Sequence, residues 1–201
     1  MSRKHPGADE YLKIGDFADN LTGTKADKER WVIDNAGRIG TFLILALPPG
    51  DTARLNNWPS KFEVNAQQKS RIQDMPCCLA GRPVVSDRLR KLIEQLSPGA
   101  AQYLPVRIMW RGEPIGGRYW VANWLRAVDC VDWARSTPRI KSIPPVEPAF
   151  LEKMEIDPRK IPASAQVFVV KHVPTTVLCT RKFRKALDDA GMVGVQYLDY
   201  E

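Results

Sequence analysis

The sequence predicts an α+β protein in which antiparallel sheet packs against two main amphipathic helices. Two segments show the i, i+3, i+4, i+7 apolar spacing of a helix, and each starts after a capping serine or threonine. The other apolar runs are short or alternate with polar residues, which is typical of strands. Sixteen prolines and thirteen glycines indicate many connecting loops. Because only two helices occur among many strands, the pattern does not favour a doubly wound parallel sheet.

The composition is that of an ordinary globular chain, with 44% hydrophobic and 26% charged residues. The length suits one domain, so we expect a single α+β unit over residues 1–201. No apolar run is long enough to span a membrane, and the first residues lack the apolar core of a secretory signal. We therefore expect a cytoplasmic protein that does not bind membranes.

Few signals mark the first part of the chain. Residues 30–50 are interpreted as two short strands around a turn at 35–37, with the second strand over Thr41–Leu47. Residues 51–83 show little periodicity, so we expect a loop there, with one short strand near Lys61–Val64.

A helix followed by a strand hairpin is predicted in the centre of the chain. Ser86 can cap the free amides of this helix, and Pro98-Gly99 ends it. Its apolar positions are Leu89, Leu92, Ile93 and Leu96. Residues 103–110 then alternate between two faces of a strand. A glycine-containing loop over 111–118 leads to one long strand, or two joined strands, over 119–133, so we expect a hairpin.

The last third repeats this kind of construction. Proline-rich surface connections are predicted over residues 136–150 and 155–165. Strands are predicted over residues 149–156, 166–173 and 194–200. The final helix should start after Thr180 and end at Gly191, a residue type that favours helix C-termini.

The tripeptide Gln-Tyr-Leu occurs at residues 102–104 and again at 196–198, each time after a predicted helix. Setting Ser86 against Thr180 aligns the two regions without a gap, and five of the 19 paired positions are identical. Chance predicts about one identity. An internal cap-helix-strand repeat would explain this, and so would two independent units of similar construction. In both interpretations the element is scaffold, because its apolar positions face inward.

The sequence shows no metal or cofactor site. Cys77 and Cys78 are adjacent, while Cys130 and Cys179 stand alone, so the spacing of a zinc site is missing. We expect buried or free thiols, with no metal and no cofactor.

No arrangement of nucleophile and base predicts an enzyme, and we expect no catalytic residue. His172 lies in a predicted alternating strand, where a structural role is the usual one. Asp129 and Asp132 are the best acidic pair, but on an extended strand they would point to opposite faces about 10 Å apart. A retaining glycosidase needs about 5 Å, which only a helical segment would allow. We expect both residues to end the strand and bind turn amides.

Positive charge is concentrated in residues 71–145, which hold 12 Lys and Arg against 6 Asp and Glu. Within them, the Arg/Trp-rich segment 107–135 interleaves four tryptophans with five arginines. Such side chains can stack nucleic-acid bases. They are also enriched at protein–protein interfaces, and tryptophans can simply fill a core. A nucleic-acid-binding module and a protein-binding module therefore both remain open.

Three motifs follow one another in residues 80–201. A V-V-S-x-R-L helix entry at Val84–Leu89 precedes a P-G turn and an aromatic-containing strand. A second aromatic-rich strand leads to D-x-x-D-W and a serine at 129–136, and A-G-x-x-G ends the last helix at 190–194. As an ordered set, these motifs resemble the eleventh immunity-protein family of bacterial polymorphic toxin systems, formerly a domain of unknown function.

The resemblance implies a protein that binds and neutralises a cognate protein toxin, and not an enzyme. Toxin and immunity genes in such systems usually lie side by side. Residues 1–79 carry no family motif and are interpreted as a variable N-terminal portion. Nucleic acid is then not expected as a partner, and the oligomeric state stays open. The motif positions implied to determine the fold are Ser86, Gly99, Asn123, Asp129, Asp132 and Gly191.

We expect the toxin to contact the edge of the predicted hairpin. This segment is the richest in arginine and aromatic residues, and a loop held between strands loses little entropy on binding. The alternative is a solvated hairpin tip whose arginines contact only water. The residues predicted to bind the partner are Arg111, Glu113, Arg118, Trp120 and Trp124.

Overall fold

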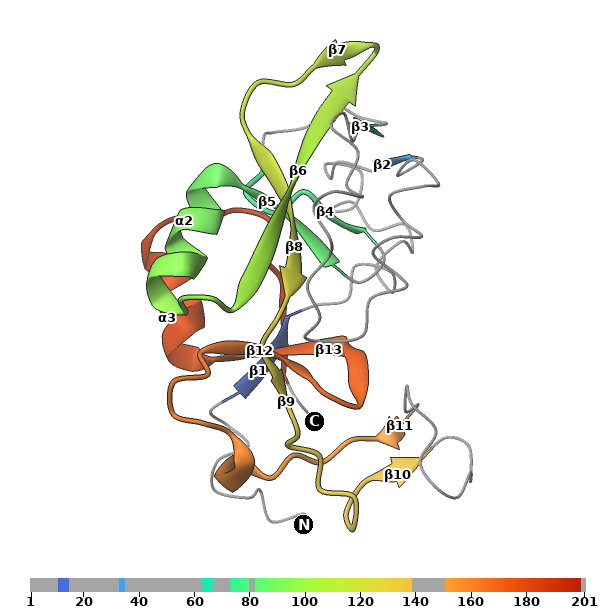
Figure 1. The fold of residues 1–201 in the computed structure, drawn as a ribbon, viewed down its shortest axis with the longest axis vertical. Coiled ribbons are helices and arrows are strands. Elements are labelled where there is room, and N and C mark those ends of the chain that lie inside the picture. The colour runs from blue at the N-terminus through green and yellow to red at the C-terminus, as the bar shows by residue number, and fades with distance from the viewer. Residues whose placement is uncertain are drawn as a thin grey trace.

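The computed structural model describes residues 11–14, 33–34, 63–66, 73–79, 82–138 and 151–199. These residues form two main sheets and two helices, which confirms the predicted α+β class (Figure 1). Neither of these helices has the length and apolar character that crossing a membrane requires. The predicted strand over Thr41–Leu47 lies outside the described residues.

The larger sheet contains the predicted hairpin. Its strand order is β2-β3-β6-β8-β5-β4, with β7 paired to β6. All of its pairs are antiparallel except β3 with β6. Its strands are β2 (Ile33–Asp34), β3 (Glu63–Ala66), β4 (Cys77–Leu79), β5 (Arg82–Ser86), β6 (Ala101–Trp110), β7 (Glu113–Pro114) and β8 (Tyr119–Trp124).

The second sheet has the order β14-β1-β13-β12-β9, and only β12 and β9 are parallel. Its β1 comes from the start of the chain and lies between β13 and β14, so the two chain ends meet in one sheet. Its strands are β1 (Tyr11–Ile14), β9 (Ala127–Val128), β12 (Val167–Val170), β13 (Val173–Thr180) and β14 (Tyr197–Asp199). A two-stranded ribbon, β10 (Thr137–Pro138) with β11 (Leu151–Lys153), and a 3₁₀ turn, η4 (Pro158–Lys160), complete the described elements.

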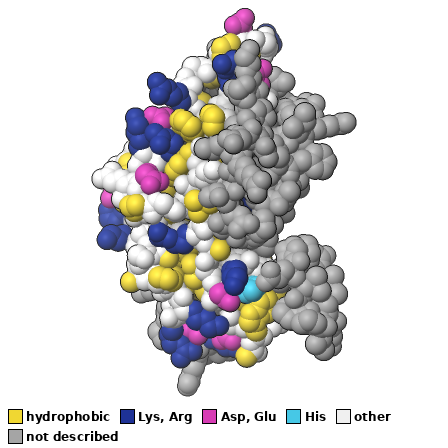
Figure 2. All heavy atoms as spheres, viewed as in Figure 1, with side chains coloured by type: hydrophobic (Ala, Val, Ile, Leu, Met, Phe, Trp, Pro, Cys, Tyr) yellow, Lys and Arg dark blue, Asp and Glu magenta, His cyan; other side chains and the backbone are white. Residues whose placement is uncertain are grey.

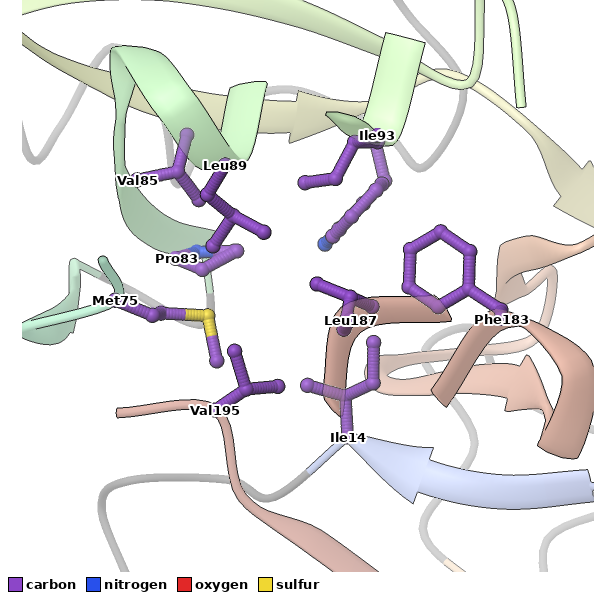
Figure 3. Close-up of a pocket in the computed structure, with 10 residues that line it drawn as sticks. Ile14, Met75, Pro83, Val85, Leu89, Ile93, Phe183, Leu187 and Val195 are labelled. Atoms are coloured by element: carbon purple, nitrogen blue, oxygen red, sulfur yellow. The ribbon is translucent and has the colours of Figure 1, made fainter. Parts of the chain in front are cut away.

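The two helices, α2 (Asp87–Leu96) and α3 (Arg181–Asp189), share one core with both sheets. Leu89 and Ile93 of α2 face Phe183 and Leu187 of α3 across a narrow apolar cavity (Figure 3). All four of these side chains are at most 3% exposed. This burial explains the apolar spacing that predicted both helices.

The two helices make the same contacts at positions 94 residues apart. Ser86 caps α2 by accepting a hydrogen bond from the amide of Leu89, and Thr180 caps α3 in the same way, both at 3.1 Å. The guanidinium of Arg90 lies 5.8 Å from the Tyr103 ring, and that of Arg184 lies 5.0 Å from the Tyr197 ring. An internal repeat stays a prediction, because two independent helix–strand units could make these contacts too.

Three details differ from the predicted elements. β5 and β4 form a pair where a loop was expected. Residues 119–133 hold two strands, β8 and β9, which is the second of the two predicted alternatives, but these strands belong to different sheets, because the chain passes from one sheet to the other at residues 125–126. The strand predicted over 166–173 is wrong at its end, because Lys171 and His172 form a turn between the antiparallel strands β12 and β13.

The helices also differ in the order of their charges. Asp87, in the first turn of α2, pairs with Lys91 one turn later at 2.9 Å, which is the favourable order for the helix dipole. In α3 the order is reversed, since Lys185 precedes its partner Asp189. The first turn of α3 has no acidic residue and its last turn has no basic residue. The charges of α3 therefore oppose its dipole at both ends.

Replacing the exposed Lys182 by glutamate should stabilise the fold, because it puts a negative charge in the first turn of α3. We expect the free energy of unfolding to rise by about 0.3–1 kcal/mol. Thermal unfolding measures this as a rise in Tm of about 1–3 °C. Lys171→Glu makes the same charge change in a turn outside the helix and should not reproduce the gain. An equal rise in both variants would show that net charge, and not the helix dipole, is responsible.

Candidate partner-binding surface

The predicted hairpin is present, and its end extends past α2 and the rest of its sheet (Figure 1). Trp110 pairs with Glu113, so only Arg111 and Gly112 form the connecting turn. Both have positive φ, 51° and 83° respectively. The Arg111 side chain is exposed, and its guanidinium lies 4.6 Å from the centre of the Trp110 ring. Charged side chains of both signs lie at this end of the molecule (Figure 2).

A bulge separates the tip of the hairpin from its base. Between the pairs Val106–Tyr119 and Met109–Pro114, the returning chain holds two more residues than β6 does. Bulges of this kind bend a strand and redirect its side chains. The carbonyl of Arg118 accepts a hydrogen bond from the Asp87 amide at 3.0 Å, which ties the bulge to the start of α2.

The predicted partner-binding residues do not form one surface. Arg111, Glu113 and Arg118 are exposed, whereas Trp120 is half-buried beneath Arg90, whose guanidinium lies 5.1 Å from its ring. Trp124 is 6% exposed and belongs to the core beside the helices. Its place in the core is a correction to the predicted set, because a residue buried by its own fold cannot contact a partner.

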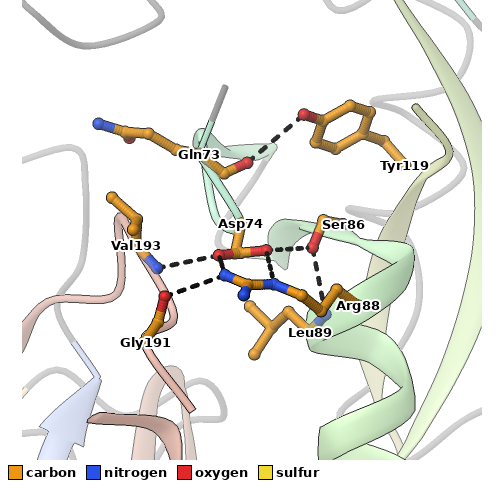
Figure 4. Close-up of polar contacts among 8 residues, drawn as sticks. All are labelled: Gln73, Asp74, Ser86, Arg88, Leu89, Tyr119, Gly191 and Val193. Atoms are coloured by element: carbon orange, nitrogen blue, oxygen red, sulfur yellow. Dashed lines mark hydrogen bonds and ion pairs between the residues drawn. The ribbon is translucent and has the colours of Figure 1, made fainter. Parts of the chain in front are cut away.

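The hairpin's scaffold is fixed by Asp74, a residue that the sequence analysis missed. Its side chain is 10% exposed and accepts hydrogen bonds from three residues in two other segments, the start of α2 and the turn after α3 (Figure 4). The Ser86 hydroxyl donates at 2.6 Å, the Val193 amide at 3.0 Å, and Arg88 through two nitrogens at 2.6 and 3.2 Å. Arg88 also donates to the Gly191 carbonyl at 2.9 Å. One carboxylate therefore joins the helix cap of α2 to the turn after α3.

Backbone hydrogen bonds reinforce the same junction. The amides of Asp74 and Met75 donate to the carbonyl of Val193 at 2.8 and 3.2 Å. The amide of Ser86 donates to the carbonyl of Asp74 at 2.7 Å. The hydroxyl of Tyr119 in β8 is 3.5 Å from the carbonyl of Gln73. The segment around Asp74 thus contacts the hairpin base as well as the start of α2 and the turn after α3.

Close packing at this junction requires glycine at one position of the A-G-x-x-G motif. Gly194 has φ of +91°, and a Cβ there would lie 2.6 Å from the carbonyl oxygen of Met75. Gly191 also has a positive φ, +61°, but a Cβ there would meet nothing within 4 Å. At Gly191, glycine is therefore favoured by the backbone conformation alone. At Gly194, it is favoured both by the backbone conformation and by the close approach of the Met75 carbonyl.

The electrostatics of Asp74 favour its charged form. Burial opposes ionisation, but the hydrogen bonds from Arg88, Ser86 and the Val193 amide outweigh that effect and hold its pKa below the ordinary value. Stabilisation from a carboxylate with a lowered pKa is present at neutral pH and is lost in acid.

Of the motif residues implied to determine the fold, Asn123 links three strands. It is 1% exposed in β8, accepts a hydrogen bond from Arg82 of β5 at 2.8 Å, and donates to Gln102 of β6 at 3.4 Å. Ser86 caps α2, as described above. Gly99 has φ of +67° in the turn after α2, which suits glycine.

The two aspartates of the D-x-x-D-W motif act separately. Asp132 accepts a hydrogen bond from the Ala134 amide at 3.2 Å, as expected for a turn. Asp129 instead lies 3.2 Å from Nε2 of His172, whose ring contacts the exposed Trp133 edge-to-face at 5.5 Å. Asp129 and Trp133 are exposed and His172 is half-buried, and these three residues form a second cluster beside β9 and the β12–β13 turn, away from the tip of the hairpin (Figure 1). His172 can contact Asp129 and Trp133 because it lies in a turn. The predicted alternating strand over residues 166–173 did not indicate these contacts.

This second cluster offers little for catalysis. Cys130 follows Asp129 directly, but burial raises the pKa of its thiol to about 11, so it is not a thiolate at neutral pH. Among the described residues, no group of three His, Cys, Asp or Glu side chains is placed to hold a metal ion.

The chain matches the model of a known protein family. The family described as "Immunity protein family (Imm11)" matches residues 16–201 of the chain. The match begins well before residue 80, where the motif resemblance starts. No curated protein matches the chain.

Replacing Asp74 with asparagine should destabilise the fold in a pH-dependent way. At about pH 7 we expect a loss of about 2–3 kcal/mol in the free energy of unfolding, because hydrogen bonds to a buried charge are lost. This stabilisation is complete above the ordinary Asp pKa of 3.8 and disappears as the pH falls through the lower folded-state value. Urea unfolding of both proteins should show the difference shrinking in acid. A difference that stays constant down to about pH 2 would contradict the role of the charge.

Proposed function

The chain belongs to the Imm11 immunity protein family, and from this premise we propose that it binds and neutralises a cognate toxin of a bacterial polymorphic toxin system. The observation that carries the proposal is the family match over residues 16–201. In this role the protein is not an enzyme. It acts in the bacterial cytoplasm by occupying a surface that the toxin needs.

The fold suits an inhibitor that acts by binding. Hydrogen bonds to Asp74 and a core shared by two sheets and two helices fix the base of the hairpin before a partner arrives. A surface that is already ordered loses little conformational entropy on binding. Inhibition by tight association needs this property more than it needs a reactive group.

We place the toxin at the tip of the hairpin, through Arg111 and Glu113, and at the adjoining bulge, through Arg118. Their exposure and their position on a hairpin that extends past the rest of the sheet support this placement. Trp120 supports this surface indirectly, because its half-buried ring lies beneath Arg90, while Trp124 supports the hairpin from within the core. Arginine is over-represented in energetically dominant contacts between proteins.

The nucleic-acid-binding alternative over residues 107–135 has less support. Base stacking requires exposed aromatic faces. Of the four tryptophans in this segment, Trp124 is buried, Trp120 lies beneath Arg90 and Trp110 beneath Arg111. Trp133 is exposed, but its ring packs edge-to-face against His172. Arg107 is already paired with Glu63 at 3.1 Å. We therefore prefer a protein partner.

The test is co-expression with the toxin domain encoded by the neighbouring gene. The wild-type protein should restore growth of cells that express the toxin, and a complex of the two proteins should be isolated from them. The double variant Arg111→Glu and Arg118→Glu should fail in both assays, because it reverses the charge of the proposed contact.

The matched control is Arg159→Glu, which reverses an arginine with an 89% exposed side chain in η4, outside the hairpin. Circular dichroism must show that every variant is folded. Toxicity that the wild-type protein does not relieve would refute the proposed function. Full protection by the folded double variant would leave the function standing and exclude the hairpin as the contact.

A further inference from the structure

Arg111 has an unusual backbone conformation for its residue type. Among the described residues, it is the one non-glycine residue with positive φ. A two-residue hairpin turn with positive φ at both positions favours Asn-Gly or Asp-Gly, because a longer side chain is sterically disfavoured at the first position. Here Arg111 stands where asparagine would fit the turn better. Strain of this kind is typical of functional positions.

The same turn fixes the direction of the side chain. The guanidinium of Arg111 lies 4.6 Å from the centre of the Trp110 ring, and Trp110 is held in the ladder by its pairing with Glu113. Stacking on an aromatic ring suits the planar guanidinium and leaves its edge free to donate hydrogen bonds. The exposed arginine is therefore already oriented in the unbound protein.

The neighbouring charges restrict what this arginine can bind. Glu113 is exposed and lies directly after the turn. A carboxylate two residues from Arg111 repels a phosphate backbone, which carries charge along its whole length. A protein surface of mixed sign can instead place a carboxylate on Arg111 and a basic or neutral group beside Glu113.

We propose that Arg111 is a preoriented anchor that binds a carboxylate group on the surface of the toxin. The inference rests on the proposed function and adds the residue and the chemistry of the contact. The guanidinium binds the carboxylate through two parallel hydrogen bonds while it stays stacked on Trp110. The strained turn keeps the arginine at the tip, at a cost to stability that asparagine would not have.

Arg111→Asn tests the inference, because stability and binding should move in opposite directions. Asparagine fits the turn, so Tm should rise by about 2–4 °C. The affinity for the toxin domain encoded by the neighbouring gene should fall about 30-fold, which corresponds to about 2 kcal/mol. Isothermal titration calorimetry with the purified toxin domain measures this affinity.

Two further variants serve as controls. Arg111→Lys keeps the charge but loses the planar fork, so its affinity should lie between those of the wild type and Arg111→Asn. Arg159→Asn makes the same substitution at an exposed arginine in η4 and should leave the affinity unchanged.

The outcomes are distinct. Arg111→Asn that binds as tightly as the wild type overturns the inference and leaves the proposed function intact. A variant that loses stability together with affinity also overturns it, since Arg111 would then support the fold. The wild-type protein is also tested for binding to a generic DNA duplex or single-stranded RNA at physiological salt. If the wild type binds either one and Arg111→Asn binds it more weakly, phosphate is the ligand and the inference fails. A wild-type protein that does not bind the toxin refutes the proposed function, and the inference with it.

Discussion

The buried carboxylate of Asp74 is the interaction on which the arrangement of the other elements depends. It binds the cap of α2, the arginine of that helix's first turn and the turn that follows α3, so its own segment, the start of α2 and the turn after α3 meet at one charge. Removing such a charge would leave several donors without an acceptor at once, which is why networks of this kind act as a unit. Gly194 lies at the same junction, and its lack of a side chain has a steric reason. Any side chain at this position would collide with the backbone beside Asp74.

This junction places the hairpin relative to the rest of the molecule. β5 ends at Ser86 beside Asp74 and pairs with β8, which is the returning strand of the hairpin. At the other end of β8, Arg126 donates hydrogen bonds to Ser97, Pro98 and Ser164 as the chain crosses into the second sheet. The hairpin is therefore fixed at its base from two directions, and only its tip lies beyond these contacts. A rigid base and an exposed tip suit the binding role that we propose.

The sequence predicted what local patterns determine. Caps, apolar spacing and glycine turns identified both helices and the hairpin, because these signals lie within a few residues of one another. Asp74 was missed because its partners lie 12, 14 and 119 residues away, and no local pattern marks such a site. His172 was assigned to a strand because Val, Lys, His and Val alternate, although the chain turns between them. For the partner-binding set, residue type alone could not separate the buried Trp124 from the exposed Arg111, since both types are common at interfaces.

The division into residues 1–79 and 80–201 stays a prediction, although β1 pairs within the C-terminal sheet.

The central claim is that a hairpin held by this scaffold is the surface that meets the toxin. Hydrogen–deuterium exchange of the protein, alone and in complex with the toxin domain, tests it most directly because it reports every backbone segment in one experiment. The account predicts that peptides covering residues 107–118 gain protection in the complex, while those around Trp133 and His172 are unchanged. Protection that appears around Trp133 and His172 and is absent from 107–118 would contradict it, and would move the interface to the other end of the molecule.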